Sequence, residues 1–561
     1  MNISIFIIMT VLFVIATMSL GWYGYKQTHG SNEFLVGTRK MSPVILALSY
    51  GATFLSASAI VGFGGQAAKY GMSMVWLVFL NLFVGLIVAF IVFGKPTRRL
   101  GKKLGAYTFS DLLGKRFKSP SIRTLSALII LIGMPIYCAA VMLGGANFLE
   151  AVTGINRNVA LLVFALITAL YVTYGGIIAV IYNDALQAGV MFIGMIVIFV
   201  FTYLVLGNGS MDILGVNSNL SNLWDVTLSG SGKLQALSNS GMNGWAAFST
   251  LGSDVWLTVV TTFLLGVGIG ALAQPQLVAR FMTASDDKSM TKSLVIGSIF
   301  MLVIVGSAYT VGALTNMFFY NEHGMVAIDY VSNVDMIMPT FVIELFSGVT
   351  FGDVFISLFV LALLCASIST MSALLHTMGA SGGYDLWSQV QAKRGKIAVG
   401  TDVHSLGANR AMTLIMTFVV VIVAFYMPDN IIAKATSIFM GLTAATLLPA
   451  YAYCLFCKGQ PNVNGATLSI IVGSISWAIW AFFVNGGIAS MIGLCKMLFG
   501  VNTLLAGSWI FVDPLIIALP LSIIALMVGR MIKPRPTSNQ KTVGRKSIIK
   551  RLSNEQQDEQ Q

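Results

Sequence analysis

The sequence predicts an all-α polytopic membrane protein with about thirteen transmembrane helices. Of its 561 residues, 56% are hydrophobic and only 10% are charged, whereas a soluble domain carries about 25% charged residues. The apolar residues also form stretches of about 18 or more, the length of a helix that crosses a bilayer. This composition excludes a soluble multidomain enzyme, a disordered chain and a secreted disulfide scaffold. The expected spans are residues 4–24, 44–67, 73–94, 124–149, 158–174, 183–207, 253–275, 293–318, 353–379, 411–427, 432–457, 465–488 and 509–530.

The basic residues indicate the topology. The formal net charge is +12, which in a soluble protein would suggest a nucleic-acid partner. Here most of the 33 Lys and Arg residues fall in segments that share one side of the membrane, chiefly 95–123, 393–410 and 530–551. Since cytoplasmic loops carry the excess of basic residues, we expect the N-terminus outside, the C-terminus in the cytoplasm and an odd number of spans. Nucleic acid is not an expected partner.

The first span, the cysteines and the C-terminal tail indicate no catalytic or binding site. No Lys or Arg precedes the first span, so we expect a retained helix rather than a signal peptide. The five cysteines are an odd, mostly membrane-embedded set, which does not form a disulfide framework. Residues 533–561 are basic and then Gln-rich, a pattern that predicts a disordered cytoplasmic tail. Membrane lipid is an expected partner, and no oligomeric state follows from the sequence.

Two of the expected spans are poor helices. Residues 44–67 contain four glycines between Gly51 and Gly65, and residues 253–275 contain three closely spaced glycines followed by Pro275. In a helix interior glycine costs about 1 kcal/mol and proline about 3 kcal/mol. Because the two weakened spans stand five helices apart, they predict an inverted repeat, and paired broken helices of this kind mark the central site of a transporter. Close packing of helices against glycine is the alternative explanation.

The repeat divides the chain into six segments. The expected segments are an N-terminal extra helix and loop (1–43), a first repeat (44–207), an outside loop (208–252), a second repeat (253–457), two C-terminal helices (458–532) and the tail (533–561).

The ninth span carries hydroxyl groups on one face. Ala366, Ser369 and Thr370 stand at i, i+3 and i+4, so they share one side of a helix. If span 2 unwinds near Ala52 and Leu55, its freed carbonyl oxygens and these hydroxyls would form an all-oxygen site suited to Na⁺. The alternative is that the hydroxyls bond back to their own helix.

Two titratable residues lie at membrane depth. Asp184 is the only charged residue between Arg157 and Asp212, and a carboxylate at this depth is a functional hypothesis, although capping of a helix is the alternative. His376 follows Ser372 by one turn; a structural hydrogen bond is favoured over a proton relay. No P-loop, nucleophile elbow or HExxH motif is present, so we expect neither an ATP-driven pump nor an enzyme, and no catalytic residue.

Four stretches together resemble the sodium/solute symporter family. They are residues 34–39 (Phe-Leu-Val-Gly-Thr-Arg), 175–187, 274–280 and 366–372. The resemblance covers about residues 30–460 and implies a leucine-transporter-like core of five plus five inverted helices. It also implies import of a small solute driven by a Na⁺ gradient, in a plasma or bacterial inner membrane, with no cofactor beyond the coupling ion.

The resemblance assigns the cation ligands residue by residue. It implies that Ala52, Leu55 and Ala366 offer carbonyl oxygens to one sodium, and that Ser369 and Thr370 offer hydroxyls to it. A second cation site would use Asp184 and Ser372. The second site also draws on a hydroxyl where this chain has Ala373, which favours a single sodium.

Departures from family members narrow the substrate. Phe54, Val267 and Ala271 replace residues that proline- and sugar-transporting members carry, and the chain looks closer to the pantothenate and monocarboxylate branch. No arginine is evident to meet a carboxylate. The residues expected near the substrate are Thr53, Phe54, Ser56, Gln66, Tyr137 and Gln274.

The sequence therefore predicts Na⁺-coupled uptake of a small organic anion by alternating access. Three alternatives stay open: H⁺ coupling through His376 or Asp184, Na⁺-coupled transport of a proline-like amino acid, and a membrane sensor that signals through residues 380–410 or the tail.

Overall fold

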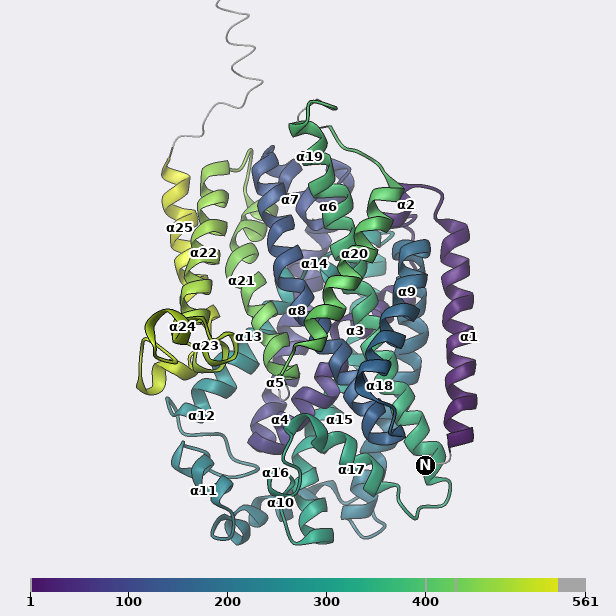
Figure 1. Ribbon diagram of the computed structural model, residues 1–561, viewed down its shortest axis with the longest axis vertical. Coiled ribbons are helices and arrows are strands. Elements are labelled where there is room, and N and C mark those ends of the chain that lie inside the picture. The colour runs from purple at the N-terminus through teal and green to yellow at the C-terminus, as the bar shows by residue number, and fades with distance from the viewer. Residues whose placement is uncertain (1–2, 399–400, 429–430, 533–561) are drawn as a thin grey trace, which may run out of the picture.

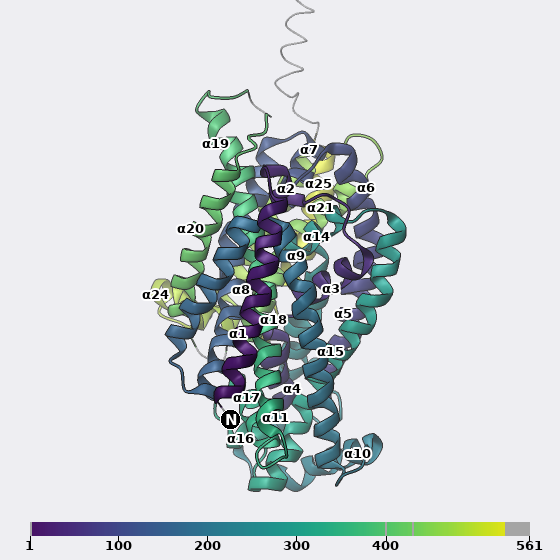
Figure 2. The same ribbon diagram turned by 90° about the vertical axis from the view of Figure 1, so that its right-hand side faces the viewer.

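The computed structural model describes residues 3–398, 401–428 and 431–532, and within these ranges the regular elements are helices (Figures 1 and 2). Eleven helices of the described chain are long and apolar enough to cross a membrane. The all-α membrane fold is therefore confirmed, but the exact count of thirteen is not. The eleven are Ile3–Gln27 (α1), Ser58–Leu104, Pro120–Thr153 (α8), Arg157–Leu206 (α9), Asp254–Ala273, Asp287–His323 (α15), Gly352–Lys393, Leu406–Phe425 (α20), Ile432–Phe456 (α21), Val463–Phe483 (α22) and Pro514–Met531 (α25).

The difference in count has two local causes. The end of the second expected span runs into the third, so residues 58–104 form one helical stretch of 47 residues. The fifth and sixth spans are joined in α9, where Gly176 alone leaves helical geometry, at φ 57° and ψ −153°. The hydroxyl of Tyr171 lies close to Gln187, yet a straight helix would separate these residues by about 24 Å. The chain therefore folds back at Gly176 without a loop.

Both spans that are rich in glycine are broken. Helix α3 (Pro43–Phe54) ends at Leu55, whose φ of −96° and ψ of 86° are not helical, and the chain continues through a π-helical turn (Ser58–Gly62) into α4 (Phe63–Tyr70). In the seventh span, α13 (Gly266–Gly270) leads into a short turn, and extended Gln274 separates it from α14 (Pro275–Thr283). Proline at the first position of α14 is favourable because it needs no hydrogen-bond acceptor there.

Helix α18 (Gly352–Ala380) lies inside the bundle and α1 lies at its edge (Figure 1). In the most apolar part of each span, 83% of the residues are buried in the stretch that contains α18, against 17% in α1. The exposed side chains of α1 include Ile8, Leu12 and Ile15. Apolar side chains exposed on a helix of this length indicate contact with lipid, whereas α18 contacts protein on almost every side.

The two ends of the described chain lie at opposite ends of the bundle (Figure 1). Helices α10 (Ile213–Leu228), α16 (Ala327–Tyr330) and α17 (Ile337–Leu345) gather at the N-terminal end. Helices α6 (Lys95–Leu104) and α7 (Phe109–Phe117) lie at the other, where α25 also ends. This arrangement requires an odd number of crossings between Ile3 and Met531. The expected tail, 533–561, lies outside the described residues.

A cluster of charges anchors the segment between α18 and α20. Arg123 of α8 donates to Asp385 at 2.8 Å and to Asp402 at 2.5 Å, and Lys115 lies 3.0 Å from Asp402 and 2.8 Å from Asp111. Burial alone would raise the pKa of Asp402, but Arg123 and Lys115 hold that pKa below its usual range. The segment is therefore fixed to α7 and α8 by ion pairs.

Candidate ion and substrate site

The hydroxyls of α18 reach the carbonyl oxygens at the break after α3. Ser369 Oγ donates to the carbonyl of Ala52 at 3.0 Å and to that of Ala366 at 3.2 Å. Thr370 Oγ1 lies 3.3 Å from the carbonyl oxygen of Ala52 and 3.1 Å from that of Thr53. All of these residues are buried. The sequence spacing thus brings hydroxyls and carbonyls from both halves of the chain to one point.

The break in α3 explains why these carbonyls are accessible. In an uninterrupted helix the carbonyls of Ala52 and Thr53 would accept from the N–H groups four residues later. Because the helix ends at Leu55, they face α18 and accept from its hydroxyls instead. Leu55 itself is buried at the break, and within the described ranges no hydrogen bond joins it to α18. Neutral oxygen atoms around an unwound helix are the ligands that bind Na⁺ in transporters with broken helices.

Asp184 lies beside these hydroxyl and carbonyl oxygen atoms, and its carboxylate is already paired with the guanidinium of Arg280. Its Oδ2 accepts from Arg280 Nη2 at 2.9 Å, from Ser49 at 2.7 Å and from Thr53 at 3.1 Å, and Ser372 lies 3.5 Å from Oδ1. The side chains of both Asp184 and Arg280 are 0% exposed. A guanidinium therefore stands next to the carboxylate that the sequence offers as a ligand for a second cation.

The sequence does not single out Arg280 as a buried arginine, and the structure pairs it with Asp184 rather than with a substrate carboxylate. The residue lies five positions after Pro275, at the last turn of α14, where a basic side chain is expected to reach the membrane surface. Folding of α14 against α3, α6 and α18 places it inside the bundle, where its Nη1 also donates to the carbonyl of Gln276 at 3.0 Å. A signal exists in hindsight, because a buried aspartate in a membrane span needs a partner.

A small cavity lies at the break between α3 and α4. Its volume of about 10 Å³ is room for roughly one water molecule, so the central site is closed around its side chains. Phe54 and Ser56, both expected near the substrate, line it, and the hydroxyl of Tyr137 faces Ser56 from α8. The other lining residues are Leu55, Ala59, Phe63, Asn81, Val267, Tyr309, Thr436 and Met440.

The remaining expected substrate residues lie elsewhere. The hydroxyl of Thr53 turns to Asp184 rather than into the central cavity. Gln274 donates to Thr443 at 2.6 Å and to the carbonyl of Gly270 at 3.1 Å, so its amide nitrogen already has two acceptors. Gln66 lines a different and larger cavity. Conversely, the sequence does not single out Asn81, although it is an amide within an apolar span and faces Tyr309.

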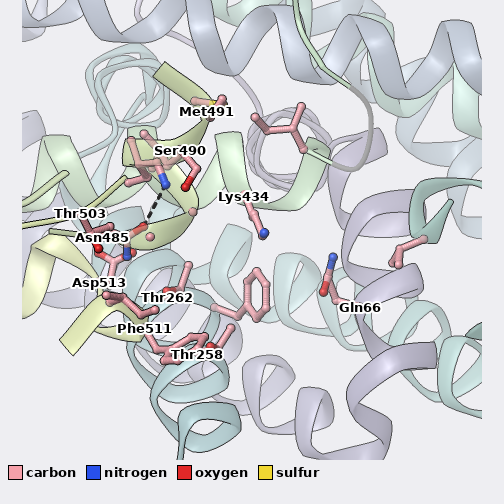
Figure 3. Close-up of a pocket in the computed structure, with 18 of the residues that line it drawn as sticks. Gln66, Thr258, Thr262, Lys434, Asn485, Ser490, Met491, Thr503, Phe511 and Asp513 are labelled. Atoms are coloured by element: carbon pink, nitrogen blue, oxygen red, sulfur yellow. Dashed lines mark hydrogen bonds between the residues drawn. The ribbon is translucent and has the colours of Figure 1, made fainter. Parts of the chain in front are cut away.

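The larger cavity, which we call the vestibule, lies beside α4 (Figure 3). Helix α4 lies toward the N-terminal end of the bundle (Figure 1). It measures about 570 Å³ and is bounded by α4, by residues 258–263, by the start of α21 and by the segment 485–513. Phe63 lines the central cavity and Phe263 lines the vestibule. Their rings meet edge to face at 5.7 Å. An aromatic contact therefore joins the wall of one cavity to the wall of the other.

Comparison with known proteins agrees with this architecture. Residues 34–500 match the model of the sodium:solute symporter family. The chain belongs to that family. It is 28% identical to a sodium/pantothenate symporter of Haemophilus influenzae, over 85% of this chain and 90% of the relative. It is 25% identical to the sodium/proline symporter of Escherichia coli, over 84% of this chain and 87% of the relative.

A solved structure of another transporter shares the fold. The substrate-bound, outward-open structure of a Na⁺-coupled sialic acid symporter superimposes with a TM-score of 0.67, covering 94% of this chain and 98% of the other at 15% identity. The leucine-transporter-like fold expected from the four sequence stretches is therefore confirmed.

Proposed function

We propose that the protein imports a small organic anion together with Na⁺ by alternating access. The observation that carries the proposal is the contact of Ser369 and Thr370 with the Ala52 carbonyl, because it joins the hydroxyl helix of one half to the broken helix of the other. An ion bound there would draw the two expected repeats, 44–207 and 253–457, together. Family membership and sodium-coupled relatives support the same coupling ion.

The substrate class rests on the central cavity. Its walls combine apolar groups, such as Phe54 and Val267, with hydroxyl and amide groups, and none of the described residues that line it carries an ionised side chain. Arg280 is already paired with Asp184 and does not serve a substrate carboxylate. A bound Na⁺ can neutralise that carboxylate instead. We therefore propose a monocarboxylate or a pantothenate-like anion as the solute, in line with the name of the pantothenate relative.

The orientation follows from charge. We propose a plasma or bacterial inner membrane, with the N-terminal end of the bundle outside and the end that carries α6 and α7 in the cytoplasm. Helix α6 alone contains five Lys and Arg residues, and the positive-inside rule places such segments in the cytoplasm. The vestibule then opens to the outside.

The deciding experiment is uptake into proteoliposomes that contain the purified full chain. Labelled acetate, pyruvate, lactate, pantothenate, proline and galactose are offered with and without an inward Na⁺ gradient. Wild type is compared with Ser369→Ala and with Ser367→Ala, which removes a buried hydroxyl from the same helix on the side facing Gly145. We expect Na⁺-driven uptake of one organic acid, lost in Ser369→Ala and retained in Ser367→Ala.

Each other outcome selects an alternative. Uptake that is independent of Na⁺ and of Ser369 but is driven by a pH gradient would identify the proton as the coupling ion. Na⁺-driven uptake of proline alone would make the protein an amino-acid symporter. Saturable binding without uptake of any solute would favour a sensor.

A further inference from the structure

Of the vestibule and the central cavity, the vestibule is the one large enough to hold a solute in this conformation. Binding sites for small molecules typically measure about 300–1,000 Å³, and the vestibule, at about 570 Å³, lies within that range. The central cavity has room for about one water molecule. A solute of several heavy atoms that approaches this conformation therefore stops on the outer side of the contact between Phe63 and Phe263.

Two lysines face the vestibule without an acidic partner. Lys69 stands at the last turn of α4 and Lys434 at the first turn of α21, and both line the cavity. The ammonium of Lys69 lies 5.1 Å from the ring of Tyr70, and that of Lys434 lies against Gly487. Throughout the described ranges, neither lysine has a carboxylate within ion-pair distance. Their charges are therefore available to a solute.

Two carboxylates near the lysines accept hydrogen bonds from the first residues of helices. Asp513 belongs to the vestibule wall, but its Oδ1 accepts from the backbone N–H of Leu515 at 2.9 Å. Asp335 lies near Lys434, but its Oδ2 accepts from the N–H of Ile432 at 3.4 Å. Both carboxylates therefore cap the first turns of helices, α25 and α21, a position that stabilises negative charge. Asp513 and Asp335 are therefore engaged by backbone N–H groups at helix ends, and neither forms an ion pair with the lysines within the described residues.

Gln66 completes a set of hydrogen-bond donors. The residue is only 5% exposed, yet its amide makes no hydrogen bond to any other described residue. Figure 3 shows the amide of Gln66 and the ammonium of Lys434 pointing into the same space from opposite walls. An ammonium has three donors and no acceptor, and an amide adds two more donors. Such a pair fits an anionic group with several acceptor lone pairs.

We propose that the vestibule is a binding site for a carboxylate group, held between the ammonium groups of Lys434 and Lys69 and the amide of Gln66. The solute waits there before it passes Phe63 and Phe263 to the central cavity. This inference rests on the proposed function for the direction of travel, whereas the binding itself does not depend on transport. A cleft with charge of one sign and low-dielectric walls concentrates ions of the opposite sign. Lys69 and Lys434 thus select anions before the central site, which lacks a fixed charge, is reached.

Protection of the lysines from acetylation tests binding directly. The purified full chain is treated with N-hydroxysuccinimidyl acetate in the presence of increasing pantothenate or pyruvate, and modification is read by peptide mass spectrometry. Panthenol, the uncharged alcohol that corresponds to pantothenate, is the matched control ligand. Lys496 of α24 (Leu494–Phe499) is exposed, belongs to the neighbouring surface and does not line the cavity, so it serves as the internal reference.

We expect a carboxylate to suppress modification of Lys434 and Lys69 in a saturable manner, while panthenol has no effect and Lys496 is unchanged. Gln66→Leu should shift the protection curve to higher concentration because one donor is lost. Equal modification of the three lysines at every concentration of both carboxylates would overturn the proposal.

Uptake kinetics provide the second test. In proteoliposomes, Lys434→Gln and Lys69→Gln should each raise the KM for the transported anion by about tenfold, the scale of electrostatic concentration in a charged cleft, with the maximal rate unchanged. Lys496→Gln removes the same charge from the same end of the molecule and should leave both constants as in wild type. Lysine variants that behave like Lys496→Gln would contradict the proposal.

The two proposals fail in distinguishable ways. Protection of Lys434 without Na⁺-driven uptake would leave the anion site standing and remove the symport mechanism. Na⁺-driven uptake of an uncharged solute, with no protection by carboxylates, would keep the symporter and remove the anion site.

Discussion

Arg280 and Asp184 form an ion pair of 2.9 Å in the interior of the bundle, where both side chains are wholly buried. Arg280 comes from α14, after the break in the seventh expected span, and Asp184 comes from the second half of α9. Ser49 and Thr53 of α3 donate to the same carboxylate. The pair therefore connects both broken spans at a point next to the hydroxyls of α18.

Neutralising one partner of this pair should destabilise the protein. Arg280→Gln would leave the carboxylate of Asp184 buried with only hydroxyl donors. Breaking a buried pair on one side typically costs about 3–5 kcal/mol, so we expect a clear fall in the apparent unfolding temperature in detergent. The measurement is thermal unfolding followed by size-exclusion chromatography of the soluble fraction.

The double variant Asp184→Asn with Arg280→Gln separates pairing from local packing. Removing both charges leaves no unpaired ion, and we expect it to recover most of the stability lost in Arg280→Gln. If the two single effects simply add in the double variant, the residues act independently and the ion pair does not hold the broken spans together.

Anion uptake should not respond to membrane voltage. The second cation site lacks a hydroxyl at Ala373, and Arg280 already supplies a positive charge to Asp184. One Na⁺ with one monoanion carries no net charge, so a tenfold Na⁺ gradient, worth about 1.4 kcal/mol, should accumulate the anion about tenfold.

A potassium diffusion potential set with valinomycin measures this directly. A second Na⁺ would add charge movement worth about 2.3 kcal/mol per 100 mV and a steep voltage dependence. Uptake of a monoanion that rises with an inside-negative potential would show that the expectation of one sodium is wrong.

His376 should be dispensable for coupling. Its Nε2 lies 2.8 Å from the carbonyl oxygen of Phe34, and since a carbonyl only accepts, this nitrogen carries the proton. The amide of His376→Gln can donate to the same oxygen, so we expect Na⁺-driven uptake to persist in this variant with an unchanged pH profile. His376→Leu, which lacks a donor, is the comparison. Loss of uptake in both variants, with coupling to pH in wild type, would support the proton alternative.

The fold could be predicted from the sequence to the extent that it depends on local composition. Stretches of apolar residues mark the spans, and the glycines before Gln274 and after Gly51 mark the two breaks. The grouping of hydroxyls on one face of α18 follows from spacing, because Ala366, Ser369 and Thr370 must share a helix face. These features need no knowledge of tertiary packing.

Features that depend on tertiary packing could not be predicted. The burial of Arg280 results from how α14 packs on α3, α6 and α18, while its position in the sequence resembles that of a residue at the membrane surface. Likewise, spacing cannot indicate that Thr443 already engages the amide of Gln274. The number of spans is affected by Gly176, because a single residue replaces the loop that separates the fifth and sixth expected spans.

The conformation of Gly176 provides the sharpest test of the reversal of the chain between the two halves of α9. At φ 57° and ψ −153°, a side chain is strained, at a cost of about 1–3 kcal/mol. A Cβ there would also lie 2.8 Å from the ring of Phe34 and 2.9 Å from the backbone of the same residue. Gly176→Ala should therefore lower the apparent unfolding temperature and the yield of folded protein. Gly189→Ala, in the same helix, is the matched control because its Cβ meets nothing within 4 Å, and alanine favours a helix over glycine by about 1 kcal/mol. Equal stability of the two variants would mean that α9 does not reverse at Gly176.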